Sequence, residues 1–595
     1  MLHETLKKYF GYESFRGEQQ QIIQDLIDGK DVVATMPTGG GKSICYQLPA
    51  LVKEGLSVVV SPLISLMENQ VSELTLLGIP AAALNSTRGP EEVSNIKREL
   101  VSGRLRVLYL SPERFSSSSL QDLLSNTKLV LFAVDEAHCL SQWGHDFRKE
   151  YLNLSRIKFD FPHVPLIALT ATATMRTKND IGRILNMQGY NLYSQSVERK
   201  NIFYKMAPKT EIKGQLAQVL ETHNNQCGIV YCPTIKEVES LEAHFKGEGY
   251  NVLKYHGKMA VAQKTANLNR FENEDDLIVF ATIAFGMGIN KPNVRFVCHN
   301  GMPKTIESFY QESGRGGRDG EDSYSYLFYG KKEMLLYRRF INESEMEEAL
   351  KADGEKKLNQ MISLCQTTSC KTELVLDYFG EDRVENCGHC DSCTGEFHFI
   401  DVTIPAQKLL SCIYRVSEKF GITHIVDILQ GSQAQKIKNF NHDQLKVHGL
   451  GRDINRNDWE AIKETLVASE MIQIGEYNAL KLTAKSKGVL TGGQKVLLKS
   501  RHATLGKLEP SAPQKQKKSR SKTTSQNPLF LALKEYRSNK SKDLGVPPYV
   551  VASDKTLLEI SEVRPTNKAE MLGITGIGEK KYDSFGQDFL ELVEN

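Results

Sequence analysis

Asp31-Val-Val-Ala-Thr-Met36 and the adjoining Pro37-Thr38-Gly39-Gly40-Gly41-Lys42-Ser43 form the stretch of sequence that decides the fold. The first run is apolar and β-branched, which predicts a strand buried on both faces of a parallel sheet. The second run is a glycine-rich turn that ends in Lys-Ser, and a helix-compatible segment begins at Ile44. A strand, a glycine-rich turn and a helix in this order are the context of a phosphate-binding loop.

The residues of this turn have separate expected tasks in binding a triphosphate. Four successive residues are expected to turn backbone N–H groups toward phosphate oxygens, namely Thr38, Gly39, Gly40 and Gly41. Lys42 is expected to reach the β- and γ-phosphates of ATP, and the Ser43 hydroxyl to bind Mg²⁺. Met36 stands where the usual pattern begins with glycine, so the strict pattern is broken. A glycine-rich surface loop is the alternative, which the flanking strand and helix disfavour.

A second buried strand is predicted at Leu129–Val134, and the acidic pair Asp135-Glu136 follows at its carboxyl end. Parallel α/β sheets place reactive groups at this edge. Asp135 is the candidate Mg²⁺ partner, and Glu136 is the candidate base that orients or activates the attacking water. Either acid alone would more often cap a loop, but the pair and the phosphate loop together indicate ATP hydrolysis.

Charge that develops on the γ-phosphate requires cationic groups, and the segment Gln311-Glu-Ser-Gly-Arg315-Gly-Gly-Arg318 supplies two. Arg315 and Arg318 are three residues apart and share one face if the segment is helical. A guanidinium that points across a cleft between domains acts as an arginine finger. Taken alone, the segment would be a solvated basic turn, but its place in a second α/β unit favours the catalytic interpretation.

Between residues 30 and about 300, short β-branched runs alternate with segments of helix length, which predicts an α/β architecture of parallel sheets. The motif positions divide the runs into two sheets, joined near Lys200–Lys213. The predicted strands are Asp31–Met36, Ser57–Ser61, Arg106–Leu110, Leu129–Val134, Leu166–Thr170, Gly228–Cys232, Leu277–Ala281 and Arg295–His299. After about residue 340 a charged helical pattern takes over, and residues 509–526 have the composition of a solvated basic linker.

The bulk composition limits the class of protein. A chain of 595 residues is too long for one hydrophobic core, so several domains are expected. The net charge of +3 is only mildly basic, so any surface for nucleic acid must be a local patch. The N-terminus has no apolar signal core, and no apolar run approaches the ~20 residues that span a bilayer, so a cytosolic protein is expected.

Eleven cysteines, an odd count in a large chain without a signal segment, argue against a disulfide framework. Six are interpreted as small core residues: Cys45, Cys139, Cys227, Cys232, Cys298 and Cys412. The other five lie between Cys365 and Cys393, where two successive Cys-x-x-Cys steps and an upstream cysteine indicate structural Zn²⁺. Cys370 is the upstream cysteine of this set, and Cys365 and His389 are rival ligands by composition. A redox dithiol is the alternative.

The segment from Cys139 to Tyr151 directly follows the acidic pair and carries Trp143, one of only two tryptophans. It also holds three further candidates for DNA contact, which are His145, Phe147 and Arg148. Bases stack on aromatic side chains with ~1–3 kcal/mol each and without sequence preference. The segment is therefore a candidate contact with a nucleic-acid strand that reports occupancy to the ATP site. A partly buried structural loop is the alternative.

These motifs together resemble superfamily 2 helicases, and specifically the RecQ family of DNA helicases, over nearly the whole chain. Residues 36–43 resemble motif I, 61–66 motif Ia, 135–138 motif II, 170–172 motif III, 229–233 motif IV, 281–292 motif V and 311–318 motif VI. The departures are small, such as Gly316 where alanine is usual and Lys149 where the family's aromatic-rich loop has proline. None of them removes a group assigned to chemistry.

The resemblance implies roles for further residues. The segment from Phe10 to Gln19 resembles the family's adenine-reading segment, which implies base contacts from Tyr12, Arg16 and Gln19. Gln311 opens motif VI and is assigned to the nucleotide site with it. The family's cysteine pattern selects four Zn²⁺ ligands, namely Cys370, Cys387, Cys390 and Cys393. The segment around Trp143 resembles the aromatic-rich loop, which implies coupling of DNA binding to ATP hydrolysis.

The resemblance also implies an order of domains. The expected order is two RecA-like helicase domains (1–204 and 205–342), a zinc-binding domain (343–400), a winged helix (401–505), a basic linker (506–526) and a small helical HRDC domain (527–595). Tyr477, at a hairpin tip of the winged helix, is a candidate strand-separating wedge, with a simple exposed turn equally open. The turn Gly576-Ile-Gly578 is a candidate phosphate contact or a tight inter-helix turn.

The first hypothesis is therefore an ATP-dependent DNA helicase, with 3′→5′ polarity and roles in recombination and repair implied by resemblance alone. An RNA helicase is the second, since Asp-Glu-Ala-His occurs there too, but the zinc module, the winged helix and the aromatic loop favour DNA. The third is a DNA-binding scaffold with a vestigial ATPase, against which the intact Lys42, Glu136, Arg315 and Arg318 argue. The expected cofactors are ATP, Mg²⁺ and Zn²⁺.

The expected partners are single-stranded and duplex DNA, with a single-strand-binding protein as a candidate protein partner and no membrane. The chain is expected to act as a monomer in the cytoplasm, associated with the nucleoid if the source is bacterial.

Overall fold

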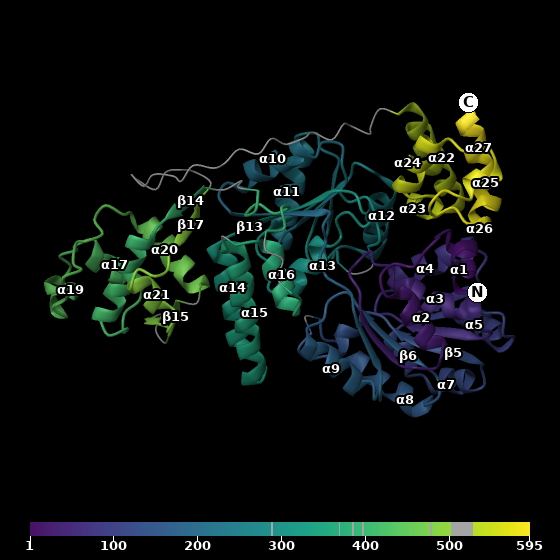
Figure 1. Cartoon of the computed structure of the whole chain (residues 1–595), viewed down its shortest axis with the longest axis horizontal. Coiled ribbons are helices and arrows are strands. Elements are labelled where there is room, and N and C mark those ends of the chain that lie inside the picture. The colour runs from purple at the N-terminus through teal and green to yellow at the C-terminus, as the bar shows by residue number, and fades with distance from the viewer. Residues whose placement is uncertain are drawn as a thin grey trace.

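The computed structural model describes residues 1–144, 146–286, 289–367, 369–382, 386–394, 398–469, 471–475, 479–500 and 527–594. Two predictions fall outside these residues, His145 as a DNA contact and Tyr477 as a wedge, and so does the expected linker. The described residues form two parallel-sheet domains, then helical units, and a C-terminal helical unit (Figure 1). Within them, no helix is both long and apolar enough to cross a membrane.

The first domain is built on a seven-stranded parallel sheet in the order β3-β4-β2-β5-β6-β1-β7. The strands are β1 (Val32–Thr35), β2 (Leu56–Val60), β3 (Ala81–Leu84), β4 (Val107–Leu110), β5 (Leu129–Val134), β6 (Leu166–Thr170) and β7 (Asn191–Ser194). Alternate strand residues enter two apolar clusters, one on each face. One face is covered by α2 (Gln19–Ile27), α3 (Lys42–Val52) and α4 (Ile64–Leu76), and the other by α5 (Pro90–Val101), α7 (Ser118–Ser125) and α9 (Met175–Ile184).

The second domain holds a six-stranded parallel sheet in the order β10-β11-β9-β12-β13-β8. Its strands are β8 (Ile202–Pro208), β9 (Gly228–Tyr231), β10 (Val252–Tyr255), β11 (Ile278–Ala281), β12 (Phe296–Asn300) and β13 (Ser323–Tyr329). Its helices are α10 (Ile212–Thr222), α11 (Ile235–Gly247), α12 (Val261–Asn273) and α13 (Ile306–Ser313). The predicted architecture of two parallel sheets is thereby confirmed.

The joint between the sheets lies at residues 195–201, slightly before the expected 200–213, because β8 already belongs to the second sheet. β8 is an edge strand in which half-buried residues interrupt the buried ones. It therefore lacks the continuous apolar run by which the central strands were identified.

Three helices and a cysteine-rich loop follow the second sheet and pack on it. They are α14 (Lys331–Glu343), α15 (Glu348–Gln366) and α16 (Lys371–Phe379). Apolar residues of these helices share one cluster with β8 and α13. The loop pairs with the sheet edge through a bridge between Cys390 and Tyr204, and Asp391 Oδ2 accepts a hydrogen bond from Met206 N at 2.8 Å. The cysteine loop is therefore fastened directly to β8.

The next unit has its own core around the buried Trp459. Its helices are α17 (Thr403–Arg415), α18 (Ile422–Leu429), α19 (Gln435–Asn439), α20 (Arg456–Ala468) and α21 (Ser486–Leu490). β14 (His398–Asp401) pairs antiparallel with β17 (Leu497–Ser500), and β15 (Ile472–Ile474) with β16 (Leu480–Leu482). Helices followed by a short antiparallel pair agree with the expected winged helix.

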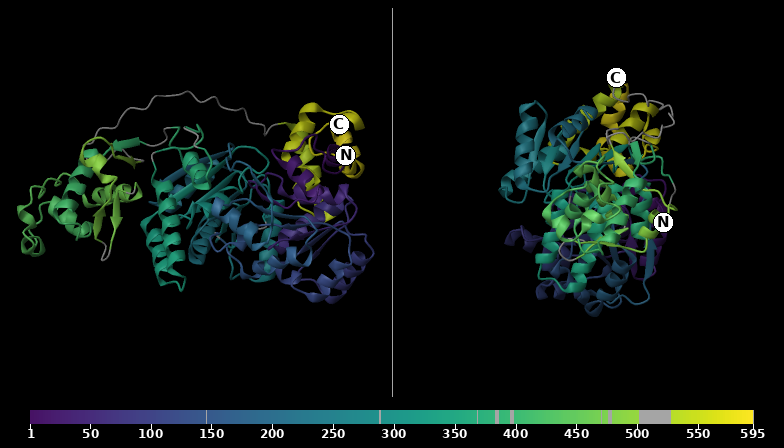
Figure 2. Two further views of the ribbon diagram at one scale, coloured as in Figure 1. Left: turned by 60° about the horizontal axis from the view of Figure 1, so that its bottom comes forward. Right: turned by 90° about the vertical axis from the view of Figure 1, so that its left-hand side faces the viewer.

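The C-terminal unit, residues 527–594, comprises α22 (Pro528–Leu544), α23 (Pro548–Val551), α24 (Asp554–Val563), α25 (Lys568–Met571), α26 (Glu579–Lys581) and α27 (Gln587–Glu594). It lies against the start of the chain, at the far end of the molecule from the winged helix (Figures 1 and 2). Gly576 N donates to Gly11 O at 3.0 Å. The two ends of the sequence therefore meet on the first domain.

Candidate active site between the two parallel-sheet domains

The phosphate loop, residues 37–43, joins β1 to α3. Gly39 and Gly41 have φ angles of 80° and 78°, where any residue with a Cβ is strained. A Cβ on Gly41 would also lie 2.4 Å from Gln19 Nε2. Met36 is not among the residues with positive φ, and its side chain is buried against Cys45. The first glycine of the usual pattern is therefore not required by the backbone here.

The acidic pair lies at the carboxyl end of β5, as expected from the sequence. Asp135 is 6% exposed, and burial, followed by the charge of Glu136, raises its pKa to about 6 although Lys42 opposes the shift. Glu136 has a φ of 48°, a conformation that costs a non-glycine residue roughly 1–3 kcal/mol. Its Oε2 lies 3.3 Å from Nδ1 of His138. A strained backbone that holds a carboxylate in place is typical of a catalytic site.

The arginine loop, residues 311–318, lies at the domain interface, where Gly314 O accepts a hydrogen bond from Thr38 Oγ1 at 3.1 Å. Arg318 Nη1 donates to Ile289 O at 2.7 Å and to Asn290 Oδ1 at 3.0 Å. Within the described residues neither Arg315 nor Arg318 forms an ion pair, and the buried Nε of each lacks a hydrogen-bond partner. Burial, followed by Arg315 and Arg199, lowers the pKa of Arg318 to about 9. Enclosed cations without an anion are costly, so this cluster fits a bound anion such as phosphate.

One cavity of about 430 Å³ collects predicted residues from both domains. Its walls include Tyr12, Arg16, Thr38, Gly39, Gly41, Lys42, Ser43, Asp135, Glu136 and Arg318. The phosphate loop, the acidic pair and a guanidinium of the second domain therefore face the same space. Such a volume is in the range of small-molecule sites.

Four predicted nucleotide-site residues lie beside the cavity rather than in its walls: Gln19, Gly40, Gln311 and Arg315. Gln19 Nε2 donates to the carbonyl oxygens of Gly40 and Gly41 at 3.1 and 3.0 Å, so it braces the phosphate loop. Gln311 Nε2 donates across the cleft to Thr172 Oγ1 at 3.3 Å. Gln19 therefore stabilises the phosphate loop, and Gln311 stabilises the contact between the two domains.

The C-terminal unit also contributes to the cavity, which the sequence did not predict. Tyr549, Thr556, Gly576 and Lys581 are among its lining residues. The Tyr549 hydroxyl is buried without a hydrogen-bond partner in the described residues. No local pattern could reveal this, since these residues are hundreds of positions from the phosphate loop.

The turn Gly576-Ile-Gly578 packs tightly on the first domain. A Cβ on Gly578 would lie 3.0 Å from the carbonyl oxygens of Lys7 and Lys8. A Cβ on Gly11 would lie 2.6 Å from Gly578 N. The glycines therefore permit close contact between two segments of the chain, whereas the sequence left a phosphate contact and an inter-helix turn equally open.

The aromatic loop, residues 139–151, is hydrogen-bonded to the acidic pair through its last residue, Tyr151. The buried Tyr151 donates its hydroxyl proton to Asp135 O at 3.0 Å. Trp143 is half-buried, with the Arg176 guanidinium 3.2 Å from its ring centroid. Its carbonyl oxygen accepts from Lys357 Nζ at 2.6 Å. The loop thus connects the acidic pair to residues that follow the second sheet.

The other aromatic-loop predictions are Phe147, which is half-buried, and Arg148, whose Nη2 lies 3.0 Å from Asp146 Oδ2. Both lie on the same loop as Trp143.

The cysteine loop brings four sulfur atoms together. Sγ atoms of Cys370, Cys387, Cys390 and Cys393 all lie within 4.8 Å of one another. Cys387 Sγ and Cys393 Sγ are 3.9 Å apart, and a tetrahedral Zn–S site with bonds of about 2.3 Å requires about 3.8 Å. The rival His389 is hydrogen-bonded through Nδ1 to Cys387 O, and Cys365 is buried in α15, outside the cluster. The sulfur set fits Zn²⁺.

Comparison with family models covers most of the chain. A DEAD/DEAH box helicase model matches residues 16–181, and a helicase conserved C-terminal domain model matches 211–320. A RecQ zinc-binding model matches 331–394, an RQC domain model 396–506 and an HRDC domain model 526–593. The phosphate loop and the acidic pair lie within the first match, the arginine loop within the second, and the cysteine loop within the zinc-binding match.

Three relatives of the same description, ATP-dependent DNA helicase RecQ, resemble the chain along almost its full length. The Pasteurella multocida protein is 38% identical over 99% of this chain and 93% of the relative. The Haemophilus influenzae protein is 38% identical over 99% and 95%, and the Bacillus subtilis protein 37% over 100% and 99%.

Proposed function

The chain belongs to the RecQ family of helicases, and from this premise we propose that it is an ATP-dependent DNA helicase. The observation that carries the proposal is the shared cavity, in which the phosphate loop and acidic pair of one domain face Arg318 of the other. ATP hydrolysis in such a cleft changes how the domains are held together. The same change can move a bound DNA strand.

Each site residue has a proposed role in hydrolysis. Lys42 binds the β- and γ-phosphates, and Glu136 orients the water that attacks the γ-phosphate and accepts its proton. Arg315 and Arg318 stabilise the negative charge that develops on the transferred phosphoryl group. The partnerless Nε atoms of both arginines support this role, because a γ-phosphate would supply the missing acceptors.

The other predicted residues of the nucleotide site are proposed to contact the adenine base, to hold the site in shape or to bind phosphate through their backbone. Tyr12 and Arg16 are proposed to contact adenine, since both line the cavity. Gln19 and Gln311 are proposed to hold the site in shape. Four residues of the phosphate loop are proposed to bind phosphate oxygens: Thr38, Gly39, Gly40 and Gly41.

Two metal ions fit the residues present. Mg²⁺ is proposed at Ser43 and Asp135, because a hydroxyl and a buried carboxylate on one cavity wall are oxygen ligands that suit a hard cation. When bound, Mg²⁺ neutralises phosphate charge. Zn²⁺ fits the four cysteine sulfurs, and its role there is to stabilise the fold, since four thiolates leave no open position.

For DNA we propose that Trp143, Phe147 and Arg148 contact a single strand and report its presence to Asp135 through Tyr151. Unwinding in the 3′→5′ direction, action as a monomer, contact with a single-strand-binding protein and a cytoplasmic, nucleoid-associated location are part of the same proposal. These finer points are carried over from the family resemblance alone.

For the domain organisation we propose the six segments expected from the sequence, with the first division moved to before Ile202. β8 pairs with β13, so residues 202–208 belong with the second domain.

The ATPase of Glu136→Gln tests the proposed chemistry. This substitution keeps the shape but removes the base, so we expect ATP to bind normally while DNA-stimulated hydrolysis falls by at least about 10²-fold. Stimulation of the wild type by single-stranded DNA, compared with RNA of the same sequence, identifies the nucleic acid. Equal hydrolysis by wild type and variant would refute the proposal, and stronger stimulation by RNA would favour an RNA helicase.

A further inference from the structure

Arg199 lies in the joint between the two sheets, and none of the motifs includes it. Its side chain is 9% exposed. Nη1 donates to Thr38 O at 3.0 Å, to Thr38 Oγ1 at 3.2 Å and to Gly314 O at 3.2 Å. Nη2 donates to Gly316 O at 2.9 Å and to Gly317 O at 3.0 Å. One guanidinium therefore joins the phosphate loop of the first domain to the arginine loop of the second.

The carbonyl oxygens that Arg199 binds in the arginine loop lie next to the two arginines of that loop. Gly314 and Gly316 flank Arg315, and Gly317 directly precedes Arg318. Because a trans peptide directs its C=O and the next N–H to opposite sides, fixing a carbonyl also fixes the backbone of the following residue. Binding these carbonyls therefore orients the backbone from which both arginine side chains extend.

Close packing of the two loops shows that the joint is tight at this point. Thr38 Oγ1 donates to Gly314 O at 3.1 Å. A Cβ on Gly314 would lie 2.7 Å from Thr38 Oγ1, and a Cβ on Gly39 would lie 3.4 Å from Arg318 O. The distance at Gly314 leaves no room for a Cβ, and the distance at Gly39 is ordinary van der Waals contact. The two loops therefore touch, so a displacement of one loop is transmitted to the other.

The chemistry of the guanidinium explains why arginine stands here. Its planar fork presents donors in two directions at once, whereas a lysine ammonium is a compact charge on a flexible stem. Hydrogen bonds from a charged donor to a carbonyl are stronger than neutral ones. A lysine at position 199 would keep the charge but not reach both loops in this geometry.

We propose that Arg199 is a positioning residue for ATP hydrolysis, which holds the arginine loop in register with the phosphate loop when the cleft is closed. It does not touch the reacting atoms. The inference rests on the proposed ATPase function and extends it to the joint between the domains. Movement of the joint during the cycle then acts directly on Arg315 and Arg318, through the carbonyls that Arg199 binds.

A matched pair of variants tests this role. Asn201 Nδ2 donates to Gly317 O and to Glu321 O, both at 2.8 Å. Within the described residues, Asn201 therefore binds the second domain near the arginine loop and forms no hydrogen bond with the phosphate loop. We expect Arg199→Ala and Arg199→Lys to lower the kcat of DNA-stimulated hydrolysis by roughly 10- to 100-fold, because misplaced catalytic groups lose rates of this size. ADP affinity should change by less than about threefold. The kcat of Asn201→Ala should stay within about twofold of wild type, because Arg199 still binds Gly317 O and still reaches the phosphate loop. Added guanidinium ion should partly restore Arg199→Ala.

The proposal is overturned if Arg199→Ala keeps wild-type kcat, if ADP affinity falls by the same factor as kcat, or if Asn201→Ala is equally impaired. Wild type and Lys42→Ala in the same assay test the ATPase itself, so absence of activity in wild type would be recognised as failure of the proposed function. Amide hydrogen exchange tests, without any ATP turnover, whether Arg199 links the two loops. Arg199→Ala should accelerate exchange in residues 36–43 and 312–320, and Asn201→Ala only in the second segment. Unchanged exchange in residues 36–43 of Arg199→Ala contradicts the bridge.

Discussion

At the scale of single residues, the ring of Trp143 has two competing partners, the Arg176 guanidinium and, in the proposed function, a DNA base. Arg176 covers its ring at 3.2 Å, which is a favourable cation–π contact worth roughly 0.5–2 kcal/mol. A base that stacks on Trp143 must either use the other face or displace the guanidinium. Because a stacked base contributes ~1–3 kcal/mol, the exchange is close to balanced. A bound DNA strand can therefore replace the contact between Arg176 and Trp143 at little cost in free energy.

Trp143→Ala should therefore weaken the response to DNA. We expect the concentration of single-stranded DNA for half-maximal ATPase to rise roughly tenfold, which corresponds to about 1.4 kcal/mol of lost stacking. Phe159→Ala is the control, since Phe159 is an exposed aromatic residue of the same domain, 82% accessible and outside the aromatic loop. An unchanged DNA response in Trp143→Ala, or an equal loss in both variants, would show that the loop is structural.

Sequence reasoning at this scale succeeded where the reason for a residue is local. Gly39 and Gly41 were identified because a loop that turns its N–H groups around phosphate needs glycine, and the structure gives both residues a left-handed backbone. Arg199 was missed because its partners Thr38 and Gly314 lie 161 and 115 residues away in the sequence. A lone arginine in Val197–Lys200 has no distinguishing spacing, so only the folded chain reveals what it holds.

At the scale of elements, the winged helix contains a buried histidine pair that makes its stability depend on pH. His424 Nε2 and His442 Nδ1 lie 2.9 Å apart between α18 and the segment after α19. Burial, then His442 and Lys436, lowers the pKa of His424 to about 4, and burial lowers that of His442. Unfolded histidines have a pKa near 6.5 and bind protons first on acidification. Their stabilising contribution is thus present above pH ~6.5 and lost as the pH falls toward about 4.

The fluorescence of Trp459 provides the measurement, because this residue is buried in the same core. The chain has two tryptophans, so in a Trp143→Phe background Trp459 is the source of all emission excited selectively through tryptophan. We expect the denaturant midpoint of this core to decrease between pH 7 and pH 5 and the decrease to be smaller in His424→Gln. A decrease that is equally steep in His424→Gln would rule out the histidine pair as its cause.

The elements themselves could be predicted unequally. Strands buried on both faces, such as β1, β2 and β5, were found from continuous apolar runs. β3 is alanine-rich and β7 alternates in burial, so neither shows such a run. Both are edge strands of their sheet, where one side of the ladder is open and the demand for apolar residues is lower.

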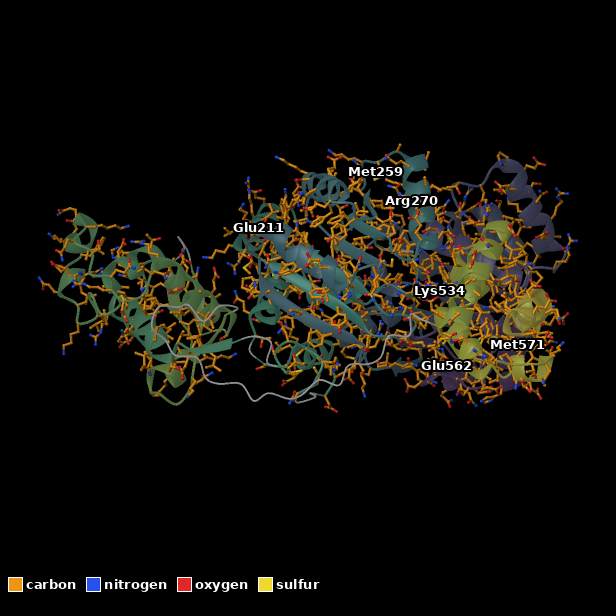
Figure 3. The ribbon with its side chains drawn as sticks, turned by 90° about the horizontal axis from the view of Figure 1, so that it is seen from above. Glu211, Met259, Arg270, Lys534, Glu562 and Met571 are labelled. Carbon is orange, nitrogen blue, oxygen red and sulfur yellow. The ribbon has the colours of Figure 1, made fainter. Side chains whose placement is uncertain are left out.

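At the scale of the whole molecule, the C-terminal unit closes over the cleft and touches both domains. Gly576 N donates to Gly11 O of the first domain, and Lys534 Nζ lies 2.8 Å from Asp275 Oδ2 of the second. Figure 3 shows Lys534 on the side of the C-terminal unit that faces the second domain. Burial opposes ionisation of Asp275, but Lys534, Lys291 and Arg537 hold its pKa well below the usual range. Charge therefore contributes to the docking of this unit on the second domain. The docking could not be predicted, because the residues in contact are far apart in the sequence and form no local pattern.

Asp275→Asn should release the C-terminal unit. The substitution removes the anion that holds Lys534 and Arg537 to the second domain, so we expect a larger radius of gyration in X-ray solution scattering. High salt should enlarge the wild type in the same direction, since screening weakens exposed ion pairs. Asp276→Asn, an exposed neighbour, is the control. Identical scattering of the two variants would show that this ion pair does not hold the unit.

Single-turnover unwinding of a 3′-tailed DNA duplex, set against an RNA duplex of the same sequence, tests the central claim most directly. The wild type should separate the DNA strands only with ATP, and Lys42→Ala should not, because it cannot hold the β- and γ-phosphates. Preference for the RNA duplex, or strand separation that survives Lys42→Ala, would contradict the assignment of this chain as an ATP-dependent DNA helicase.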